Sequence, residues 1–161
     1  MMKKGFCCGT FDPITIGHVD IIERAAKLCD NIVVGVVVNY AKTSFFNLEE
    51  RTEMVRAALA HIPNVEVVSF SDHLPTYVKD NGFDMIIRGL RNGSDFEYEI
   101  GLAQLYDYFL KGSCETVYIM TKPEYSYISS TIIRQNFSLG ADISGWVTEP
   151  VYKLMKQFRN K

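Results

Sequence analysis

The stretch KGFCCGTFDPITIGHVDIIERAAKLCDNIVVGVVV, residues 4–38, decides the fold because strand and helix patterns alternate along it. Residues 4–8 form a short apolar segment that ends at a Gly-Thr-Phe-Asp-Pro turn. Between Gly17 and Cys29 the apolar side chains recur at helical spacing. Residues 32–38 are apolar throughout and rich in β-branched residues, as expected for a strand covered on both faces. The stretch therefore predicts a strand-helix-strand unit.

The rest of the chain continues this alternation. Two helix starts are marked by capping-box patterns, Asn47 with Glu50 and Ser94 with Glu97. The predicted strands cover residues 65–70, 83–87 and 116–120, and the predicted helices cover 47–60, 74–81, 94–110 and segments that begin near 129 and 149. Apolar strands that alternate with helices are typical of a parallel sheet between two helical layers. We therefore predict the α/β class: a single Rossmann-like domain over residues 1–161, with a five-stranded parallel sheet and helices on both faces.

The composition indicates a globular protein and excludes several function classes. The 161 residues suffice for one ordinary domain, and 47% of them are hydrophobic, which allows a substantial core. Acidic residues outnumber basic ones by 19 to 17, so we expect no nucleic-acid partner of the kind that requires a basic face. The longest apolar run, residues 32–38, is far shorter than the roughly 20 residues of a bilayer span. We expect no membrane segment, no secretory signal and a cytoplasmic location.

The spacing of cysteine and histidine does not predict a metal site. None of the four cysteines forms a CxxC pair, and the three histidines lie far apart in the sequence. Cys7 and Cys8 are adjacent, so that they should point to opposite faces of a strand. We expect free, buried or half-buried thiols in a reducing compartment, and no metal ion held by the protein itself.

Residues that can bind an anion follow the predicted strands. Ligands of open parallel sheets bind beyond the carboxyl ends of the strands, at the point where the strand order reverses. The residues at these ends are Thr10 and His18 after the first strand, Lys42 after the second, Leu74 after the third, Arg88 and Arg91 after the fourth, and 125–134 after the fifth. Lysine, arginines and a histidine thus converge on one edge of an acidic protein. This pattern predicts a site for a phosphate-bearing ligand.

Each of these signals also has an ordinary structural interpretation. His18 at a helix start adds a hydrogen-bond donor whose protonation can be tuned near neutral pH, but a histidine there can simply cap the helix. Arg88 and Arg91 can hold phosphate in a bidentate fork or remain solvated loop residues. Glu99, in the helix that follows, fits either an exposed carboxylate or the ion-pair partner of one of these arginines.

A run of hydroxyl side chains, residues 129–131, is predicted at a helix start, with Arg134 one turn later. Hydroxyls, free backbone N–H groups and a guanidinium can bind terminal phosphates, although the same residues form a common capping motif. The chain lacks GxGxxG after its first strand and lacks GxxxxGK[ST]. These absences argue against NAD or FAD binding of the usual kind and exclude a P-loop kinase or GTPase.

Together, several motifs give the chain a resemblance to a known family. They are TxGH at 15–18, which follows GTFDP, LEER at 48–51, RGLR at 88–91, DFEYE at 95–99 and ISST at 128–131. TxGH and ISST are typical of the nucleotidyltransferase superfamily, and the whole set resembles the bacterial phosphopantetheine adenylyltransferases over essentially the full chain. The resemblance implies transfer of the adenylyl group of ATP to 4′-phosphopantetheine, which gives dephospho-coenzyme A and pyrophosphate in the penultimate step of coenzyme A biosynthesis. It also implies Mg²⁺ bound with ATP, coenzyme A as a feedback ligand and a homohexamer.

The resemblance further implies roles for individual residues. His18 and Lys42 fall on catalytic positions. The positions that bind 4′-phosphopantetheine correspond to Thr10, Lys42, Leu74 and Arg88. The positions that bind ATP correspond to Thr10, Phe11, His18, Gly89, Leu90, Arg91, Glu99, Tyr125, Ser126, Tyr127, Ile128, Ser129, Ser130 and Thr131. Cys8, Ile16 and Tyr125 depart from the proline, asparagine and tryptophan that are common in the family, and none of these departures affects an expected catalytic role.

Two other functions share part of this pattern. A sister adenylyl- or cytidylyltransferase that acts on nicotinamide mononucleotide or a small phosphorylated alcohol would also carry TxGH and ISST, but RGLR and DFEYE favour the pantetheine enzyme. A non-catalytic nucleotide-binding or sensor domain is expected to lose His18, Lys42 or Arg91, and the sequence retains all of them.

Overall fold

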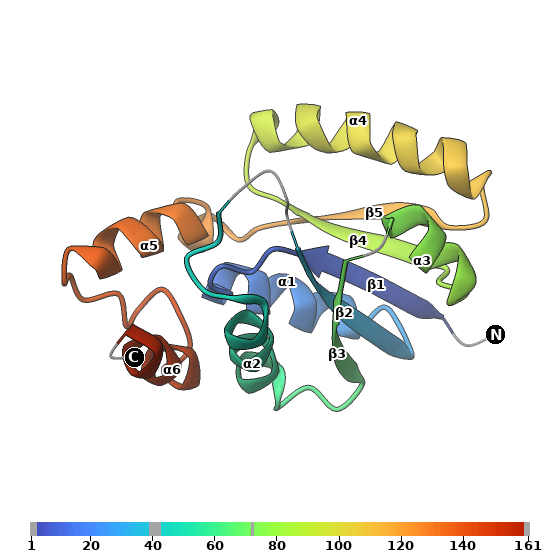
Figure 1. Cartoon of the computed structure of the whole chain (residues 1–161). Coiled ribbons are helices and arrows are strands. Elements are labelled where there is room, and N and C mark those ends of the chain that lie inside the picture. Colours follow the sequence, from blue (N-terminus) through green and yellow to red (C-terminus); the bar gives the residue numbers. More distant parts are fainter. Residues whose placement is uncertain (1–2, 39–42, 72, 160–161) are drawn as a thin grey trace.

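The computed structural model describes residues 3–38, 43–71 and 73–159, and a parallel sheet lies at its centre (Figure 1). The strands are β1 (Lys4–Gly9), β2 (Asn31–Val37), β3 (Val65–Phe70), β4 (Met85–Leu90) and β5 (Glu115–Met120). They pair in the order β3-β2-β1-β4-β5, and every pair is parallel. The predicted five-stranded parallel sheet is confirmed.

Helices cover both faces of the sheet, as the sequence predicts. They are α1 (Ile16–Ala26), α2 (Leu48–Leu59), α3 (Leu74–Asp80), α4 (Gly93–Leu110), α5 (Ser130–Ser138) and α6 (Glu149–Arg159), and η1 (Pro123–Tyr125) is a short 3-10 turn. One core cluster packs the sheet against α1, α2, α5 and α6, and a second packs the other face against α3 and α4. Cys7 belongs to the first cluster and Cys8 to the second, as expected for neighbours in a strand. All four cysteines are free and buried, which confirms the prediction of free thiols.

β4 is longer at its carboxyl end than the sequence suggests. The predicted strand ends at residue 87, whereas residues 88–90 continue β4 and pair with residues 118–120 of β5. The apolar run that predicts β4 stops early, because pairing with a neighbouring strand leaves no mark in the local sequence. Arg88 is therefore held in a strand and not in a loop.

The two predicted capping boxes have different outcomes. Asn47 and Glu50 form the reciprocal pair at the start of α2, with N–H···O distances of 2.9 and 3.0 Å. The box predicted at residues 94 and 97 is wrong, because α4 begins one residue earlier and its N-cap is Asn92, which accepts the N–H of Asp95 at 2.9 Å. Asparagine caps a helix as well as serine does, so the earlier residue defines the helix start.

α4 has 18 residues and runs along the outer side of the sheet beside β4 and β5 (Figure 1). Only Glu99 and Leu110 of this helix are buried, so most of its surface is exposed. Neither α4 nor any other helix of the described ranges has the length and apolar character that crossing a bilayer requires.

The strand order reverses between β1 and β4. From β1 the chain proceeds to β2 and β3 on one side of the sheet, and then crosses to β4 and β5 on the other side. The connections that leave the carboxyl ends of β1 and β4 therefore run in opposite directions. This divergence is the usual origin of a ligand crevice in a doubly wound sheet.

Candidate active site

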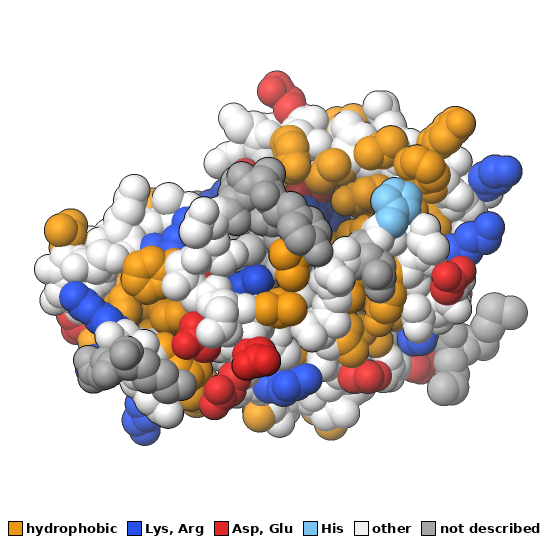
Figure 2. All heavy atoms as spheres, in the orientation of Figure 1, with side chains coloured by type: hydrophobic (Ala, Val, Ile, Leu, Met, Phe, Trp, Pro, Cys, Tyr) orange, Lys and Arg blue, Asp and Glu red, His pale blue; other side chains and the backbone are white. Residues whose placement is uncertain are grey.

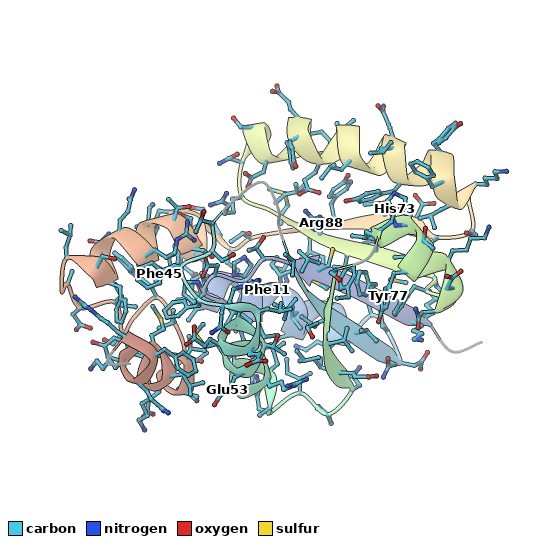
Figure 3. The ribbon with its side chains drawn as sticks, viewed as in Figure 1. Phe11, Phe45, Glu53, His73, Tyr77 and Arg88 are labelled. Atoms are coloured by element: carbon cyan, nitrogen blue, oxygen red, sulfur yellow. The ribbon has the colours of Figure 1, made fainter. Side chains whose placement is uncertain are left out.

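A pocket of about 440 Å³ opens at the carboxyl ends of β1 and β4, where the strand order reverses. Its walls come from the turn after β1, the start of α1, the end of β4, the start of α4 and residues 121–134. Phe11, from the turn, and Arg88, from β4, mark two of these walls (Figure 3). The volume is typical of a small-molecule site.

Most of the residues that the sequence places at a phosphate site line this pocket. They are Thr10, Phe11, His18, Arg88, Gly89, Arg91, Glu99, Tyr125, Ile128, Ser129, Ser130 and Thr131. These residues come from segments far apart in the sequence, and the parallel sheet brings them together at one edge. Lys42, which the sequence also places here, lies outside the described residues.

Leu74, Leu90, Ser126 and Tyr127 do not line the pocket, although the resemblance assigns them to the site. Leu74 packs against the core cluster beneath α3 and α4. The side chain of Leu90 is buried, and its carbonyl accepts the N–H of Thr121 at 2.8 Å. Tyr127 is 61% exposed. The roles that the sequence suggests for these residues stay predictions.

His18 is held at the start of α1 by a reciprocal pair with Thr15. The Thr15 hydroxyl oxygen accepts the N–H of His18 at 3.2 Å, and Nδ1 of the His18 ring accepts the N–H of Thr15 at 3.1 Å. Histidine thus takes the place that glutamate or glutamine has in the usual capping box. Because Nδ1 accepts from a backbone N–H, the proton of the neutral ring lies on Nε2. The ring can therefore offer a ligand one donor, the Nε2–H group.

The surroundings of His18 keep its imidazole uncharged at neutral pH. Burial, together with the positive charges of Arg91 and Arg88, lowers the pKa of His18 to about 4. The sequence predicts only that the protonation of His18 can be tuned near neutral pH. In the structure the pKa of the ring lies lower, because burial and two nearby guanidinium groups disfavour its charged form. The ring of Phe11 meets the imidazole edge to face, with a centroid distance of 5.2 Å. His18 is therefore suited to act as a neutral hydrogen-bond donor.

We expect nuclear magnetic resonance of the ring nitrogens to show His18 as the neutral Nε2–H form at pH 7, with protonation only near a pKa of about 4. The unfolded chain binds this proton more readily, with a pKa of 6.5. The contribution of His18 to stability is therefore fully present above pH 6.5 and declines as the pH falls toward 4. Signals that are absent from a His18→Ala sample identify the residue. A proton on Nδ1 at neutral pH, or a pKa of 6.5 in the folded protein, would contradict this account of the site.

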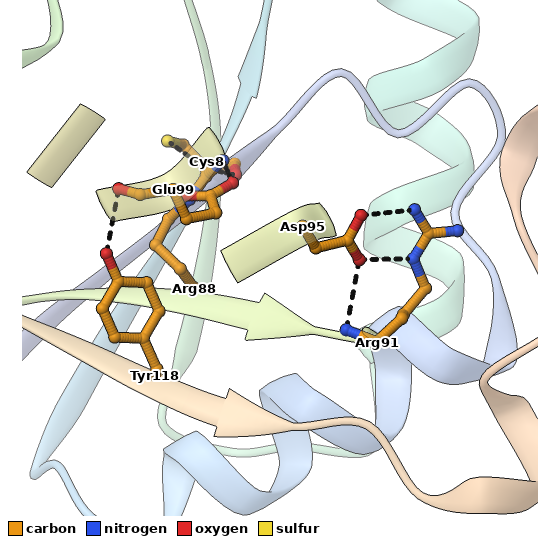
Figure 4. A network of polar contacts seen from close by, with 6 residues as sticks. All are labelled: Cys8, Arg88, Arg91, Asp95, Glu99 and Tyr118. Atoms are coloured by element: carbon orange, nitrogen blue, oxygen red, sulfur yellow. Dashed lines mark hydrogen bonds and ion pairs between the residues drawn. The ribbon is translucent and has the colours of Figure 1, made fainter. Parts of the chain in front are cut away.

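Arg88 and Glu99 form a bidentate ion pair between β4 and α4 (Figure 4). Arg88 donates from Nε and Nη2 to the two carboxylate oxygens at 2.7 and 2.6 Å, and from Nη1 to the Cys8 carbonyl at 2.9 Å. The two side chains are only 19% and 11% exposed. Tyr118 donates its hydroxyl to the backbone carbonyl of Glu99 at 3.0 Å. Of the two interpretations of Glu99, the structure thus shows the ion pair. Nη1 of Arg88 also donates to Cys8 Sγ at 3.6 Å, so one N–H group, on Nη2, is left for a ligand.

Two further arginines of the pocket wall also have carboxylate partners. Arg91 donates from Nε and Nη2 to Asp95 at 3.0 and 3.1 Å (Figure 4). Arg134 donates to the backbone carbonyl of Asp12 at 2.6 Å and lies 3.7 Å from its carboxylate. The predicted group of cations is thus balanced by acidic side chains. An anionic ligand would share these arginines with their carboxylates or displace the carboxylates.

Sequence reasoning missed both Asp12 and Asp95 as pocket residues. Asp95 lies four residues after Arg91, a spacing that favours an ion pair and could have identified it. Asp12 carries no comparable signal, because its partner Arg134 is 122 residues away. The carboxylate of Asp12 also accepts the backbone N–H groups of residues 45 and 46 at 2.8 and 3.0 Å, so it fixes the segment that leads into α2.

The hydroxyl run at residues 129–131 both anchors α5 and lines the pocket. Ser129 caps the helix by accepting the N–H of Ile132 at 3.2 Å, which confirms the capping interpretation. Ser130 donates its hydroxyl to the carbonyl of Pro13 at 2.8 Å and so ties α5 to the turn after β1. Because the first residues of α5 line the pocket, the N–H groups that a helix start leaves unpaired are available to an anion there.

Comparisons with known proteins agree with this geometry. Residues 6–136 match the cytidylyltransferase-like family. A phosphopantetheine adenylyltransferase from Lachnoclostridium phytofermentans is 42% identical over 154 residues, which cover 96% of this chain and 94% of that protein. A crystal structure of a proposed nicotinate-nucleotide adenylyltransferase from Vibrio parahaemolyticus superposes with a TM-score of 0.74 over 98% of this chain and 93% of that one. Its sequence identity is 18%, so this likeness concerns the fold alone.

Proposed function

Because the chain belongs to the cytidylyltransferase-like family, and within it to the phosphopantetheine adenylyltransferases, we propose that it transfers the adenylyl group of ATP to 4′-phosphopantetheine. The products are dephospho-coenzyme A and pyrophosphate. The observation that carries the proposal is the 42% identity over 96% of the chain to a protein of that name. The pocket supports it, since arginines, hydroxyls and a neutral histidine donor suit a ligand with several phosphates.

The proposed chemistry requires positioning more than it requires acid-base catalysis. The nucleophile is an oxygen of the 4′-phosphate, which is already anionic at neutral pH, so no general base has to remove a proton. The barrier lies in bringing two anions together and in stabilising the charge that develops on the α-phosphoryl oxygens during in-line displacement. His18 would donate its Nε2–H to these oxygens. Because the imidazole is neutral, its hydrogen bond strengthens as charge develops on them.

The remaining residues would bind the two substrates, some holding the 4′-phosphate and others the phosphates of ATP. Arg88 would use the uncommitted N–H group of Nη2 to hold the 4′-phosphate together with Thr10 and Lys42. Arg91 and the hydroxyl run at 129–131 would hold the departing pyrophosphate. Arg88, Arg91 and Ser130 already have hydrogen-bond partners within the protein. These partners keep the three side chains in place before the substrates bind.

Mg²⁺ would enter with ATP instead of occupying a cage built by the protein. Among the residues that the structure describes, no group of three or more histidine, cysteine or acidic side chains could hold a metal ion. The carboxylates of the pocket are instead engaged with arginines or backbone N–H groups. This arrangement fits Mg²⁺, which keeps several waters and readily binds phosphate oxygens. When bound, the ion would neutralise part of the charge of the triphosphate.

Removing Mg²⁺ with a chelator is expected to abolish turnover and to leave the protein folded, because the ion serves the nucleotide and not the fold. Pyrophosphate release measures the first effect, and circular dichroism measures the second. Turnover should return when excess Mg²⁺ is added. Loss of secondary structure in the chelator would reveal a structural metal ion and would contradict this view.

The homohexamer that the family resemblance implies requires contacts between subunits, and the exposed surface of α4 is suited to one such contact. This helix carries several large apolar side chains in contact with solvent, and they gather along its length (Figure 2). They are Phe96, Tyr98, Ile100, Leu105, Tyr108 and Phe109. Apolar surface of this extent is typical of a protein-protein interface. We therefore propose that α4 forms a contact between subunits.

Aspartate at both Leu105 and Tyr108 is expected to shift the protein to smaller assemblies, because two charges would be buried without partners in the α4 contact. Sedimentation velocity measures the change. The matched control is Leu139→Asp, on a leucine that is 86% exposed at the end of α5 and should leave the assembly unchanged. An α4 double variant that sediments like the parent protein would show that this helix does not hold the subunits together.

Coenzyme A is proposed as a feedback ligand, since it shares the pantetheine arm and the adenylate of the reaction product and can compete for the same pocket. A cytoplasmic location is supported by the four free cysteines, which fit a reducing compartment.

The proposed reaction itself is tested by incubating the protein with ATP, Mg²⁺ and 4′-phosphopantetheine and by identifying the products with mass spectrometry. Dephospho-coenzyme A is the expected product, and its absence from a folded sample would refute the proposal.

A further inference from the structure

Asp20 of α1 is a buried carboxylate that has no part in the mechanism described above. It is 5% exposed, and it binds two cations from different parts of the chain. The amine of Lys122, which follows β5, lies 2.6 Å from Oδ1. Nη1 of Arg24, one turn further along α1, donates to Oδ2 at 3.0 Å and also to the carbonyl of Met120 at 2.7 Å. Asp20 and Arg24 thus join α1 to the end of β5 through two separate links.

None of these side chains lines the pocket, but their neighbours do. His18 lies two residues before Asp20, and Tyr125 ends η1, which begins at Pro123 directly after Lys122. The start of α1 also packs on η1, because a Cβ placed on Gly17 would lie 3.5 Å from Cβ of Tyr125. The amine of Lys122 lies 5.7 Å from the centre of the Tyr125 ring. The Asp20 cluster therefore lies behind the wall that residues 121–131 contribute to the pocket.

An exposed ion pair would have little effect on this geometry, since most surface pairs contribute almost nothing measurable. Asp20 differs because its side chain is only 6% exposed and because it accepts from two cations at once. Shielded, charge-assisted hydrogen bonds are strong and directional. Loss of the carboxylate would leave Lys122 and Arg24 without their shared partner and would free the segment after β5 to move relative to α1.

We propose that Asp20, Lys122 and Arg24 form a positioning clamp, which sets the wall at residues 121–131 against α1 and so fixes the distance between His18 and the nucleotide-binding hydroxyls. The inference rests on the proposed function, because it assigns that wall to ATP. The clamp lies on the β5 side of α1, whereas Arg88 points toward α4 and Cys8. Loss of the clamp should therefore weaken the binding of ATP and leave the binding of 4′-phosphopantetheine nearly unchanged.

The test compares Asp20→Asn, Lys122→Met and the double variant with the parent protein. Asp20→Asn is expected to raise both the Kd and the KM for ATP roughly tenfold, which is the factor expected if the freed wall holds its ATP-binding geometry only about a tenth of the time. The KM for 4′-phosphopantetheine should stay within about twofold, since a purely structural defect would raise both KM values together. Because the two side chains act through one contact, the double variant should bind ATP no more weakly than Asp20→Asn does. Lys153→Met is the matched control, since it removes an exposed ion pair of 2.6 Å on α6.

The Kd for ATP is measured by calorimetry without the second substrate, so that it does not depend on turnover. Unchanged ATP affinity in a folded Asp20→Asn variant would overturn the clamp, and so would an equal rise of both KM values. If Asp20→Asn does not fold, the ATP affinity of Lys122→Met tests the clamp instead. This variant should fold, because the side chain of Lys122 is half exposed. A parent protein that binds ATP but does not use 4′-phosphopantetheine would refute the proposed function alone, and one that binds no ATP would refute both.

Discussion

Replacing His18 by alanine is expected to lower kcat by about 10²–10³ and to change the KM for either substrate little. The reason lies in the ring geometry. Thr15 occupies Nδ1, and burial together with the nearby arginines keeps the imidazole neutral, so that Nε2–H is the donor that remains. A donor aimed at the α-phosphoryl oxygens gains strength as these oxygens gain charge in the transition state. Steady-state kinetics with both substrates varied measures the effect.

The matched control for this variant is His61→Ala. His61 is an exposed histidine whose Nε2 lies 2.7 Å from Glu23. Neither residue lines the pocket, and loss of His61 should leave kcat unchanged. Unaltered thermal melting of His18→Ala must accompany the kinetic effect. If kcat falls by less than about threefold, which corresponds to under about 1 kcal/mol in the barrier, His18 has no catalytic role and only caps α1.

Replacing Arg88 by alanine is expected to have two large effects, of which the sequence suggested only one. The KM for 4′-phosphopantetheine should rise more than kcat falls, because Arg88 would hold the substrate phosphate in the ground state and the transition state alike. Stability should also fall by about 3–5 kcal/mol, because the nearly buried carboxylate of Glu99 loses its bidentate partner. Kinetics and thermal melting measure the two effects separately.

The double variant Arg88→Ala with Glu99→Gln separates substrate binding from stability. Removing the stranded charge should restore part of the lost stability, whereas the KM for 4′-phosphopantetheine should stay high. A double variant that regains the KM of the parent protein would mean that Arg88 acts through the fold alone. Melting of Arg88→Ala at the parent temperature would mean that the ion pair does not hold α4 to β4.

The sheet could be predicted because its signals are local. Residues 32–38 and 65–70 are rich in β-branched side chains, and the capping box of Asn47 and Glu50 marks a helix start by itself. The end of β4 could not be predicted in the same way, since residues 88–90 include a charge and a glycine and are strand only because they pair with β5. The start of α4 was missed because Asn92 and Ser94 are both good caps, and the sequence alone did not decide between them.

The pocket was predictable to the extent that one edge of the sheet gathers its residues. His18 and the hydroxyl run follow strand ends, Arg88 lies in the carboxyl-terminal half of β4, and all of them line the pocket. The ion-pair partners of these residues were harder to predict from the sequence. The pairing of Arg88 with Glu99 was one of two open alternatives. The pairing of Arg134 with Asp12 depends on a tertiary contact between distant segments. The charge balance of the site, and with it the low pKa of His18, therefore emerges only in three dimensions.

The most direct test of the central claim is the specificity of pyrophosphate release. ATP and Mg²⁺ are combined with either 4′-phosphopantetheine or nicotinamide mononucleotide, and kcat/KM is measured for each second substrate. The account predicts rapid release that depends on 4′-phosphopantetheine and yields dephospho-coenzyme A, with negligible turnover of nicotinamide mononucleotide. Turnover of nicotinamide mononucleotide without turnover of 4′-phosphopantetheine would contradict it and would identify a sister nucleotidyltransferase instead.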